Sequence, residues 1–273
     1  MRLKSLDDLL FFIRWQFYPI VLSLPAHISF VMRGWGSNNR SSVSRFGLAI
    51  KCIHIHLAVR CGHNPAEALK IVEEIISLPK DRPGIVVECG AFLGGSTAKI
   101  SHAVASMQRK LIVCDSFRGL PDVAPSDHSN EKRDFQKGEY EGRLEEVKEN
   151  VALYGQKECV DYIPGWYSES LVELQGVPIA CAFWDVDLQE SFKSCIKGLW
   201  ANMQPGSKVF IHDFDRESVV AVFTDSDWWL SETGEAPPEI KGAFTGLGTL
   251  SPLLGYAVKT GVSRQRLFPA HEG

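Results

Sequence analysis

The sequence lacks the cysteine patterns of disulfide-stapled and zinc-binding proteins. It has seven cysteines, an odd number, and no Cys-x-x-Cys pair. Several lie in or beside apolar runs of the kind that form strands: Cys89, Cys114, Cys159 and Cys181. We therefore expect buried thiols in a reducing compartment, which predicts a cytoplasmic protein. No cleavable signal peptide is apparent, because Asp7 and Asp8 lie near the start and no small-residue cleavage site follows a clean apolar core.

The chain also lacks the positive charge of a dedicated nucleic-acid binder, because its formal net charge is −4. This charge is unevenly distributed. Residues 1–60 contain eight basic and two acidic side chains, which gives +6 and leaves −10 for the rest of the chain. The asymmetry predicts an anionic partner for the N-terminal part, and we include the inner membrane surface among such partners.

No apolar run is long and clean enough to cross a bilayer. Residues 9–32 are the most apolar segment, but Arg14, Pro19, Pro25 and His27 interrupt it. A spanning helix needs about 20 mostly apolar residues, so we predict one or two short helices here, broken near the prolines. Their apolar faces and flanking basic residues fit an interfacial anchor within residues 1–40, a homodimer contact, or a cap on the protein's own domain.

The next segment, residues 34–44, is rich in glycine and serine and is predicted to be a linker. We therefore divide the chain into an apolar, basic extension with its linker, residues 1–44, and one large α/β domain, residues 45–273. A helix is expected over residues 45–61. Its two histidines, at positions 54 and 56, are two residues apart and face different sides, which makes a metal pair there unfavourable.

Beyond this helix, apolar runs of strand length alternate with segments of helical periodicity. Asn64, Pro65 and Glu67 mark the start of a helix that ends before Pro79. The alternation predicts parallel strands joined by right-handed crossovers. We expect strands at residues 84–89, 111–115, 159–163, 179–185 and 208–213, and two more, one of them antiparallel, within 240–269. The expected helices are 97–107, 141–154, 190–203 and 216–230, with a long loop at 116–139.

The first of these strands runs into a glycine-rich turn, VECGAFLGGST, at residues 86–97. It is neither the dinucleotide motif Gly-x-Gly-x-x-Gly nor a phosphate loop, because no Gly-Lys-Ser/Thr follows. Glycines allow tight turning and close approach to a ligand, and the following helix offers free N–H groups. Glu88 at the strand end suits the ribose and amino-acid end of S-adenosylmethionine. The candidate cofactor residues in this turn are Glu88, Gly90, Gly94, Gly95 and Ser96.

Polar and aromatic residues end the next two strands. Asp115 ends the second strand, where an acidic side chain in nucleotide-binding α/β folds accepts hydrogen bonds from ribose hydroxyls. Gly165 and Trp166 end the third strand, and an adenine ring stacks well on a tryptophan there. A helix-capping Asp115 and a plain core Trp166 are the structural alternatives.

Acidic side chains end the fourth and fifth strands. Asp185 and Asp187 lie in WDVDLQES, and His212 and Asp213 lie in VFIHDFD. Carboxylates that meet at adjacent strand ends repel each other unless a cation or a proton intervenes. Oxygen ligands of this kind suit Mg²⁺, which would orient a substrate hydroxyl and lower its pKa. In the alternative, His212 is the general base that removes the hydroxyl proton.

These segments together resemble the macrocin O-methyltransferase family of class I S-adenosylmethionine-dependent enzymes, which methylate sugar hydroxyls. The resemblance covers about residues 84–224 and rests on the glycine turn, CDSFRGLPD with Ser116, GWYSESL, WDVDLQES and QPGSKVFIHDF. It implies a Rossmann-like fold with a seven-stranded mixed sheet, order 3-2-1-4-5-7-6, between helices. It also implies O-methylation of a sugar, glycan or natural-product acceptor, with Asp185 and the strand-five pair as ligands of a divalent metal, Mg²⁺ or Mn²⁺.

One position departs from the family pattern, because His212-Asp213 stands where two aspartates are expected. Histidine is a poor ligand for Mg²⁺ and a better one for Mn²⁺, Fe²⁺ or Zn²⁺. The site has either changed its metal, with Asp185, His212 and Asp213 as ligands, or lost it and taken up His212 as the base. Two further interpretations stay open: an oxygenase like the cephalosporin hydroxylases, and a non-catalytic protein that keeps the fold.

Overall fold

The computed structural model describes residue 10 and residues 12–33, 41–127, 135–242 and 254–261 of the chain. Its centre is a six-stranded sheet of order β3-β2-β1-β4-β5-β6, parallel except for β6, which pairs antiparallel with β5. The strands are β1 (Ile85–Cys89), β2 (Leu111–Asp115), β3 (Val160–Pro164), β4 (Ile179–Trp184), β5 (Met203–Ile211) and β6 (Gly255–Val258). The order reverses between β1 and β4, where open α/β sheets bind their ligands.

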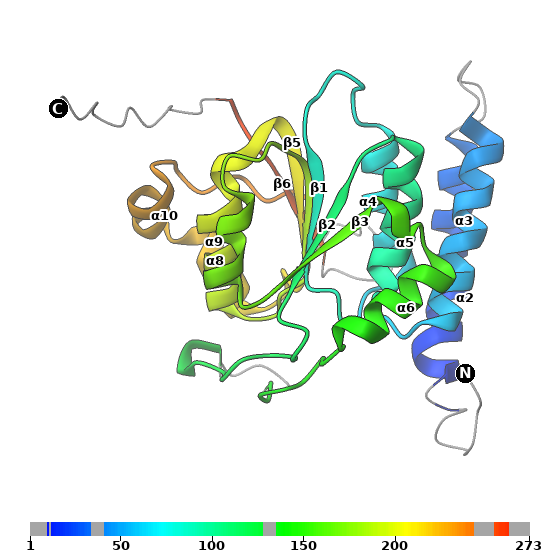
Figure 1. The fold of residues 1–273 in the computed structure, drawn as a ribbon, viewed down its shortest axis with the longest axis horizontal. Coiled ribbons are helices and arrows are strands. Elements are labelled where there is room, and N and C mark those ends of the chain that lie inside the picture. The colour runs from blue at the N-terminus through cyan, green and yellow to red at the C-terminus, as the bar shows by residue number, and fades with distance from the viewer. Residues whose placement is uncertain (1–9, 11, 34–40, 128–134, 243–253, 262–273) are drawn as a thin grey trace.

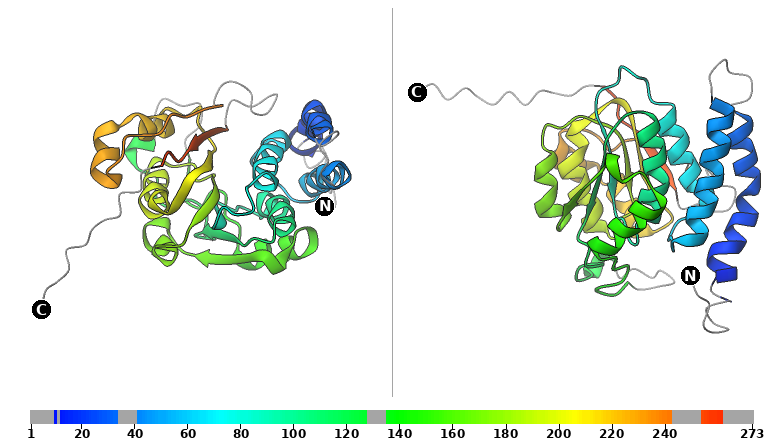
Figure 2. Two further views of the ribbon diagram at one scale, coloured as in Figure 1. Left: turned by 90° about the horizontal axis from the view of Figure 1, so that it is seen from above. Right: turned by 45° about the vertical axis from the view of Figure 1, so that its right-hand side comes forward.

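Helices cover both faces of this sheet (Figures 1 and 2). The helices of the described residues are α2 (Tyr18–Met32), α3 (Ser41–Ala58), α4 (Pro65–Ile76), α5 (Gly95–Ser106), α6 (Leu144–Tyr154), α7 (Tyr167–Ser170), α8 (Gln189–Leu199), α9 (Glu217–Thr224) and α10 (Ser226–Thr233). Short π or 3-10 turns are η1 (Ile13–Phe17), η2 (Pro125–Asp127), η3 (Lys157–Cys159), η4 (Leu171–Leu174) and η5 (Trp200–Asn202). The helical pair α2 and α3 forms an additional outer layer against α4 and α5.

Strand alternation explains the two-sided core. Val86 of β1 points into the cluster under α4 and α5, whereas Val87 points into the cluster under α8 and α9. In β4 all six residues are buried, as expected for a central parallel strand covered on both faces. All seven cysteines are free and six are buried, so the prediction of thiols without disulfides is confirmed, with Cys61 partly exposed.

The predicted mixed sheet is confirmed, but its last part differs from the prediction. The described residues contain one of the two strands expected within 240–269, namely β6, which takes the antiparallel place beside β5. Beyond β6, Lys241 makes a single bridge with Tyr256, so the outermost seventh strand is reduced to that contact in the described part. The helix predicted over 216–230 is two helices, α9 and α10, because Asp225 ends the first and caps the second with its side chain.

The N-terminal segment is more regular than predicted. The backbone is helical from η1 through α2, although we expected breaks near Pro19 and Pro25. Pro19 sits in the first turn of α2, where no N–H bond is required. Pro25 lies inside α2 and removes one of its backbone hydrogen bonds. The buried side of α2 packs on α4, and this packing keeps the helix continuous through Pro25. The last four residues of the predicted linker, 41–44, belong to α3; the division of the chain at residue 44 stays a prediction.

Candidate active site

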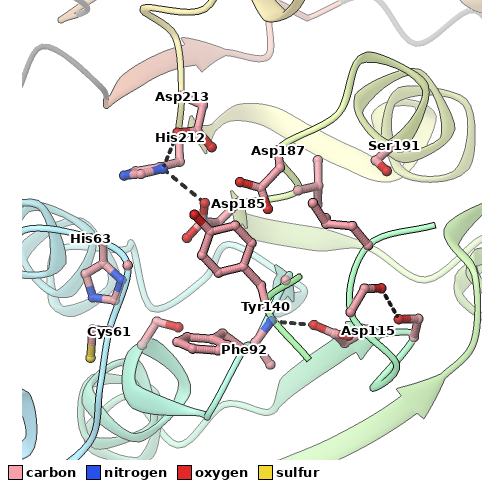
Figure 3. A pocket seen from close by; sticks show the side chains of 18 of the residues that line it. Cys61, His63, Phe92, Asp115, Tyr140, Asp185, Asp187, Ser191, His212 and Asp213 are labelled. Atoms are coloured by element: carbon pink, nitrogen blue, oxygen red, sulfur yellow. Dashed lines mark hydrogen bonds and ion pairs between the residues drawn. The ribbon is translucent and has the colours of Figure 1, made fainter. Parts of the chain in front are cut away.

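A cavity of about 250 Å³ lies at the carboxyl ends of the parallel strands. Figure 3 shows Asp115 at the end of β2 and side chains from the segments that follow β1, β4 and β5, all around this one space. The lining residues are Arg60, Cys61, Gly62, His63, Gly90, Ala91, Phe92, Gly95, Ser96, Asp115, Ser116, Gly119, Leu120, Pro121, Tyr140, Trp166, Tyr167, Asp185, Val186, Asp187, Ser191, His212 and Asp213. Most of the predicted site residues are therefore brought together.

The glycine turn after β1 forms one wall of the cavity. Gly90 has φ +91°, and a Cβ built on it would lie 1.8 Å from the carbonyl oxygen of Asp185. Gly94 has φ +81° and precedes α5, and Gly95 fits against Cys61, whose Sγ would lie 2.2 Å from an added Cβ. The absence of a side chain therefore lets Gly90 approach the backbone of Asp185 and lets Gly95 approach the Cys61 thiol. Gly90, Gly95 and Ser96 line the cavity, whereas Gly94 only shapes the turn behind it.

Glu88 lies behind this wall and does not line the cavity. Its side chain is fully buried, and Thr97 donates a hydrogen bond of 2.6 Å from Oγ1 to Glu88 Oε2. Burial raises the pKa of Glu88 to about 7; the hydrogen bonds from Ser96 and Thr97 oppose this, and the charges of Asp185 and Asp115 add to it. Glu88 thus holds the first turn of α5, and its direct contact with a cofactor stays a prediction.

This buried carboxyl predicts a pH dependence of stability that a Glu88→Gln variant removes. In the unfolded chain Glu88 titrates near 4.5, and in the folded chain near 7. Between these values the folded state holds more protons, so the stabilisation is complete below pH 4.5 and is lost as the pH rises to about 7. We expect the stability of Glu88→Gln relative to the wild type to rise by on the order of 3 kcal/mol from pH 5 to pH 8.

Urea unfolding at pH 5, 6, 7 and 8 measures this difference. Glu158→Gln, a variant of an exposed glutamate on η3, is the control and should follow the wild type at every pH. A constant difference between Glu88→Gln and the wild type across this range would show that Glu88 has the same pKa in both states.

Asp115 at the end of β2 is anchored on both of its oxygens. Its Oδ2 accepts the Ala91 N–H at 2.7 Å, and its Oδ1 accepts the Phe117 N–H at 2.7 Å. Burial raises the pKa of Asp115, and the backbone N–H donors oppose that shift. The carboxylate therefore ties the β1–α5 turn to the β2 turn. It also lines the cavity, where each oxygen can accept a further hydrogen bond.

The DSFRGLP segment after β2 forms a tight turn beside Asp115. Ser116 donates from Oγ to the Gly119 carbonyl at 3.0 Å, and Phe117 and Gly119 have φ of +55° and +72°. Across the cavity, Trp166 and Tyr167 line the wall where β3 leads into α7, whereas Gly165, at φ +150°, only makes the turn before them. The structure thus places Ser116 and Trp166 at the cavity and Gly165 outside its lining.

The acidic cluster at the ends of β4 and β5 surrounds His212. Its Nδ1 lies 3.0 Å from Asp185 Oδ1 and 3.2 Å from Asp213 Oδ1 (Figure 3), and its Nε2 lies 3.5 Å from Glu67 Oε2. Burial by itself lowers the pKa of His212, but the charges of Asp185 and Asp213 outweigh it and raise the pKa well above the usual value. Glu67 also completes the capping box of α4 through the Asn64 N–H.

This cluster has the donor set of a divalent-cation site. One ligand atom from each of Asp185, His212 and Asp213 lies within 4.8 Å of the others. Asp213 Oδ2 is buried without a hydrogen-bond partner in the described residues, and Asp187 adds a further carboxylate whose pKa is raised well above its usual value by burial and by its acidic neighbours. These residues therefore fit a divalent cation. A cation and a proton would compete for the same ring nitrogen of His212, so the nitrogen carries a proton when no cation is bound.

Sequence reasoning missed the part of the cavity that comes from loops. Phe92 and Tyr140 form an edge-to-face pair with ring centroids 5.6 Å apart, and the Arg60 guanidinium lies 5.7 Å from the Phe92 ring centre. Cys61 and His63 come from the α3–α4 connection. Phe92 lies within the glycine turn at residues 86–97, but the turn motif does not single it out, and the α3–α4 connection carries no motif. The φ of +47° at Phe92 and of +57° at Tyr140 cannot be read from the sequence.

A buried lysine fixes this α3–α4 connection to the glycine turn. Lys99 of α5 is fully buried, with Nζ 3.3 Å from His56 Nδ1, 3.3 Å from His63 Nε2 and 3.2 Å from Cys61 Sγ. An ammonium group only donates, so both histidine nitrogens accept. Burial and the charge of Lys99 lower the pKa of His63 well below its usual value. The cluster therefore holds His63 in its neutral form beside the cavity.

Comparison with known proteins relates this geometry to O-methyltransferases. Residues 65–227, more than half of the chain, match the family profile described as macrocin-O-methyltransferase (TylF). An 8-demethyl-8-(2,3-dimethoxy-alpha-L-rhamnosyl)-tetracenomycin-C 4'-O-methyltransferase of Streptomyces olivaceus is 31% identical over 140 residues, 48% of this chain and 53% of that protein. Demethyldecarbamoylnovobiocin O-methyltransferase of Streptomyces niveus is 28% identical over 150 residues, 52% and 56% of the two chains. The chain thus spans about half the length of these curated relatives.

Solved structures agree on the fold. The O-methyltransferase NovP superposes with a TM-score of 0.56 at 21% identity, covering 93% of this chain and 98% of NovP. The calicheamicin methyltransferase CalS11 superposes with a TM-score of 0.58 at 15% identity, covering 94% of each chain. The predicted class I methyltransferase fold is therefore confirmed.

Proposed function

This chain belongs to the macrocin O-methyltransferase family, and we propose that it transfers the methyl group of S-adenosylmethionine to a hydroxyl oxygen of a sugar, glycan or natural-product acceptor. One observation carries the proposal: Asp115 at the end of β2 and the acidic cluster at the ends of β4 and β5 face a single cavity. This arrangement supports nucleoside binding by Asp115 and proton acceptance by the acidic cluster on two sides of one space. The relatives named above support a sugar-bearing acceptor.

The donor half of the cavity lies along β1, β2 and α7. Its lining includes the predicted cofactor residues Gly90, Gly95, Ser96, Asp115, Ser116 and Trp166. We assign the ribose hydroxyls to Asp115, since its two oxygens keep acceptor capacity on the cavity side. Trp166 would pack against the adenine. Glu88 acts behind them by holding α5 through Thr97.

The acceptor half lies at Asp185, Asp213 and His212. The hydroxyl oxygen attacks the methyl carbon, the carbon–sulfur bond breaks with its electron pair on sulfur, and S-adenosylhomocysteine is released. We assign the hydroxyl proton to Asp185, whose pKa is raised by burial and which lines the cavity. The Nδ1 atom of His212 faces Asp185 and Asp213, and its Nε2 atom faces Glu67. We therefore assign His212 the role of a positioning residue that orients the carboxylate of Asp185.

A divalent metal would be held by Asp185, His212 and Asp213. When bound, it would orient the acceptor hydroxyl and lower its pKa. With an imidazole in the set, we propose Mn²⁺ before Mg²⁺. The acidic side chains that crowd the cluster, Asp187 among them, supply the negative charge that such an ion needs.

Calorimetric titration with S-adenosylmethionine tests the donor assignment. We expect the wild type to bind, and Asp115→Asn to bind roughly ten-fold or more weakly, because a charge-assisted hydrogen bond contributes about 1.5–3 kcal/mol. Asp122→Asn, whose side chain is 84% exposed, is the matched control and should bind like the wild type.

The same titration in EDTA and in Mn²⁺ or Mg²⁺ tests the metal. Absence of S-adenosylmethionine binding under all conditions would overturn the methyltransferase proposal and leave the oxygenase and non-catalytic interpretations. Cofactor binding without any metal binding would remove only the metal and leave Asp185 and His212 to act alone.

A further inference from the structure

The outer helix of the molecule exposes a continuous apolar stripe. The stripe consists of Ile13, Phe17, Val21, Leu24, Ile28 and Met32, whose side chains are 43–63% exposed. Their spacing of three or four residues places them along one face through η1 and α2. The buried residues of α2 lie on another face, toward α4. Single exposed apolar residues need no explanation, but six in one row indicate a surface that is covered by a partner.

The next helix also exposes apolar side chains. Phe46 and Ile50 of α3, four residues apart, are 57% and 50% exposed. The helices α2 and α3 pack on each other and form the outermost layer of the molecule on this side (Figures 1 and 2). No helix of the described residues is long and apolar enough to cross a membrane. The surface therefore fits a partner that lies against it.

The charged side chains of η1, α2, α3 and the residues between them are all basic. The sequence has no aspartate or glutamate between Asp8 and Glu67, whereas Arg14 lies in η1, Arg33 follows α2, and Arg45 and Lys51 lie on α3. Two of these, Arg33 and Arg45, share the single carboxylate of Glu73 in α4, at 2.6 and 3.1 Å, which leaves one positive charge uncompensated within that trio. An apolar row with basic and no acidic flanks is complementary to an anionic surface.

A second copy of the chain does not satisfy these charges. A contact between two copies of this face would bring their basic residues together, since neither helix supplies an acidic partner. An anionic bilayer supplies both an apolar interior for the stripe and phosphate groups for the flanks. We propose that α2 and α3 dock on an anionic lipid bilayer, with the helix axes along the membrane surface and the stripe buried among the acyl chains.

The position of the stripe relates this surface to the cavity. Its first turn, η1, lies at the same end of the molecule as the loops that follow β1 and β2 (Figure 1). A bilayer along α2 would therefore run past the cavity end of the sheet. This docking does not depend on the proposed methyl transfer, because it rests on the outer helices alone.

Vesicle flotation of the full chain tests the proposal. We expect binding to phosphatidylcholine vesicles with 30% phosphatidylglycerol, and roughly ten-fold or more loss of binding when Val21→Glu and Ile28→Glu are combined, since each adds a charge within the apolar stripe. The control combines Leu153→Glu and Leu230→Glu, which change exposed apolar residues of α6 and α10 by the same charge. It should bind within about two-fold of the wild type.

The remaining measurements separate the outcomes. Binding should weaken on vesicles without phosphatidylglycerol and at 1 M salt, where the screening length falls to about 3 Å. Wild-type protein that stays off anionic vesicles, or a stripe variant that binds like the control, would overturn the proposal. Sedimentation velocity without lipid identifies the alternative: a dimer that the stripe variant converts to monomer, with no vesicle binding, would make this face a contact between copies.

Discussion

Replacing Asp185 by asparagine is expected to lower kcat for methyl transfer by roughly 10²–10⁴-fold, the range contributed by a positioned acid–base group. Asparagine keeps the shape of the side chain and the contact with His212 but cannot accept the hydroxyl proton. S-adenosylhomocysteine release measures kcat, with a sugar-bearing acceptor that the wild type methylates. The affinity for S-adenosylmethionine should stay within about three-fold, because Asp185 lies on the acceptor side of the cavity.

Asp215→Asn is the control for this variant. Asp215 follows Asp213 by two residues and is exposed, and it does not line the cavity. The Asp215→Asn variant removes one negative charge from the same region, as Asp185→Asn does, and should retain the wild-type kcat. If Asp185→Asn keeps kcat within about ten-fold of the wild type, the proton acceptor is another group and the assignment of Asp185 is wrong.

The second large effect is expected from Gly90→Ala. The added Cβ would lie 1.8 Å from the Asp185 carbonyl oxygen, and φ at Gly90 is +91°. Overpacking costs about 1–3 kcal/mol and a left-handed backbone adds about 1–2 kcal/mol, so we expect a loss of about 3 kcal/mol in the free energy of unfolding. Urea unfolding measures this loss. The cavity should also lose cofactor affinity, because Gly90 is part of its wall.

Gly176→Ala separates the two contributions. Gly176 has φ +76°, but an added Cβ would meet nothing within 4 Å. This variant carries only the backbone strain and should lose about 1–2 kcal/mol. Equal losses in Gly90→Ala and Gly176→Ala would show that the backbone of Asp185 moves away freely, and the tight junction between β1 and β4 would then not be required for stability.

The sequence by itself determined the framework of the cavity. Apolar runs and helical periodicity predicted β1 to β5 and the helices between them, because a buried parallel strand must be apolar on both faces. Parallel strands all end at one edge of the sheet, so Gly90, Asp115, Asp185 and His212 had to meet once the strands were identified. The DSFRGLP segment resembled one family closely, and the family is confirmed.

Only the tertiary structure decided which distant segments complete this site. Tyr140 and the α3–α4 connection reach the cavity through packing, and Lys99, buried in α5, is what holds that connection in place. Packing on α4 also keeps α2 helical through Pro25 and so creates the exposed stripe. The protonation of His212 depends on Asp185 and Asp213 at 3.0 and 3.2 Å. Such effects arise from distances between residues remote in the chain, and local sequence preferences do not encode them.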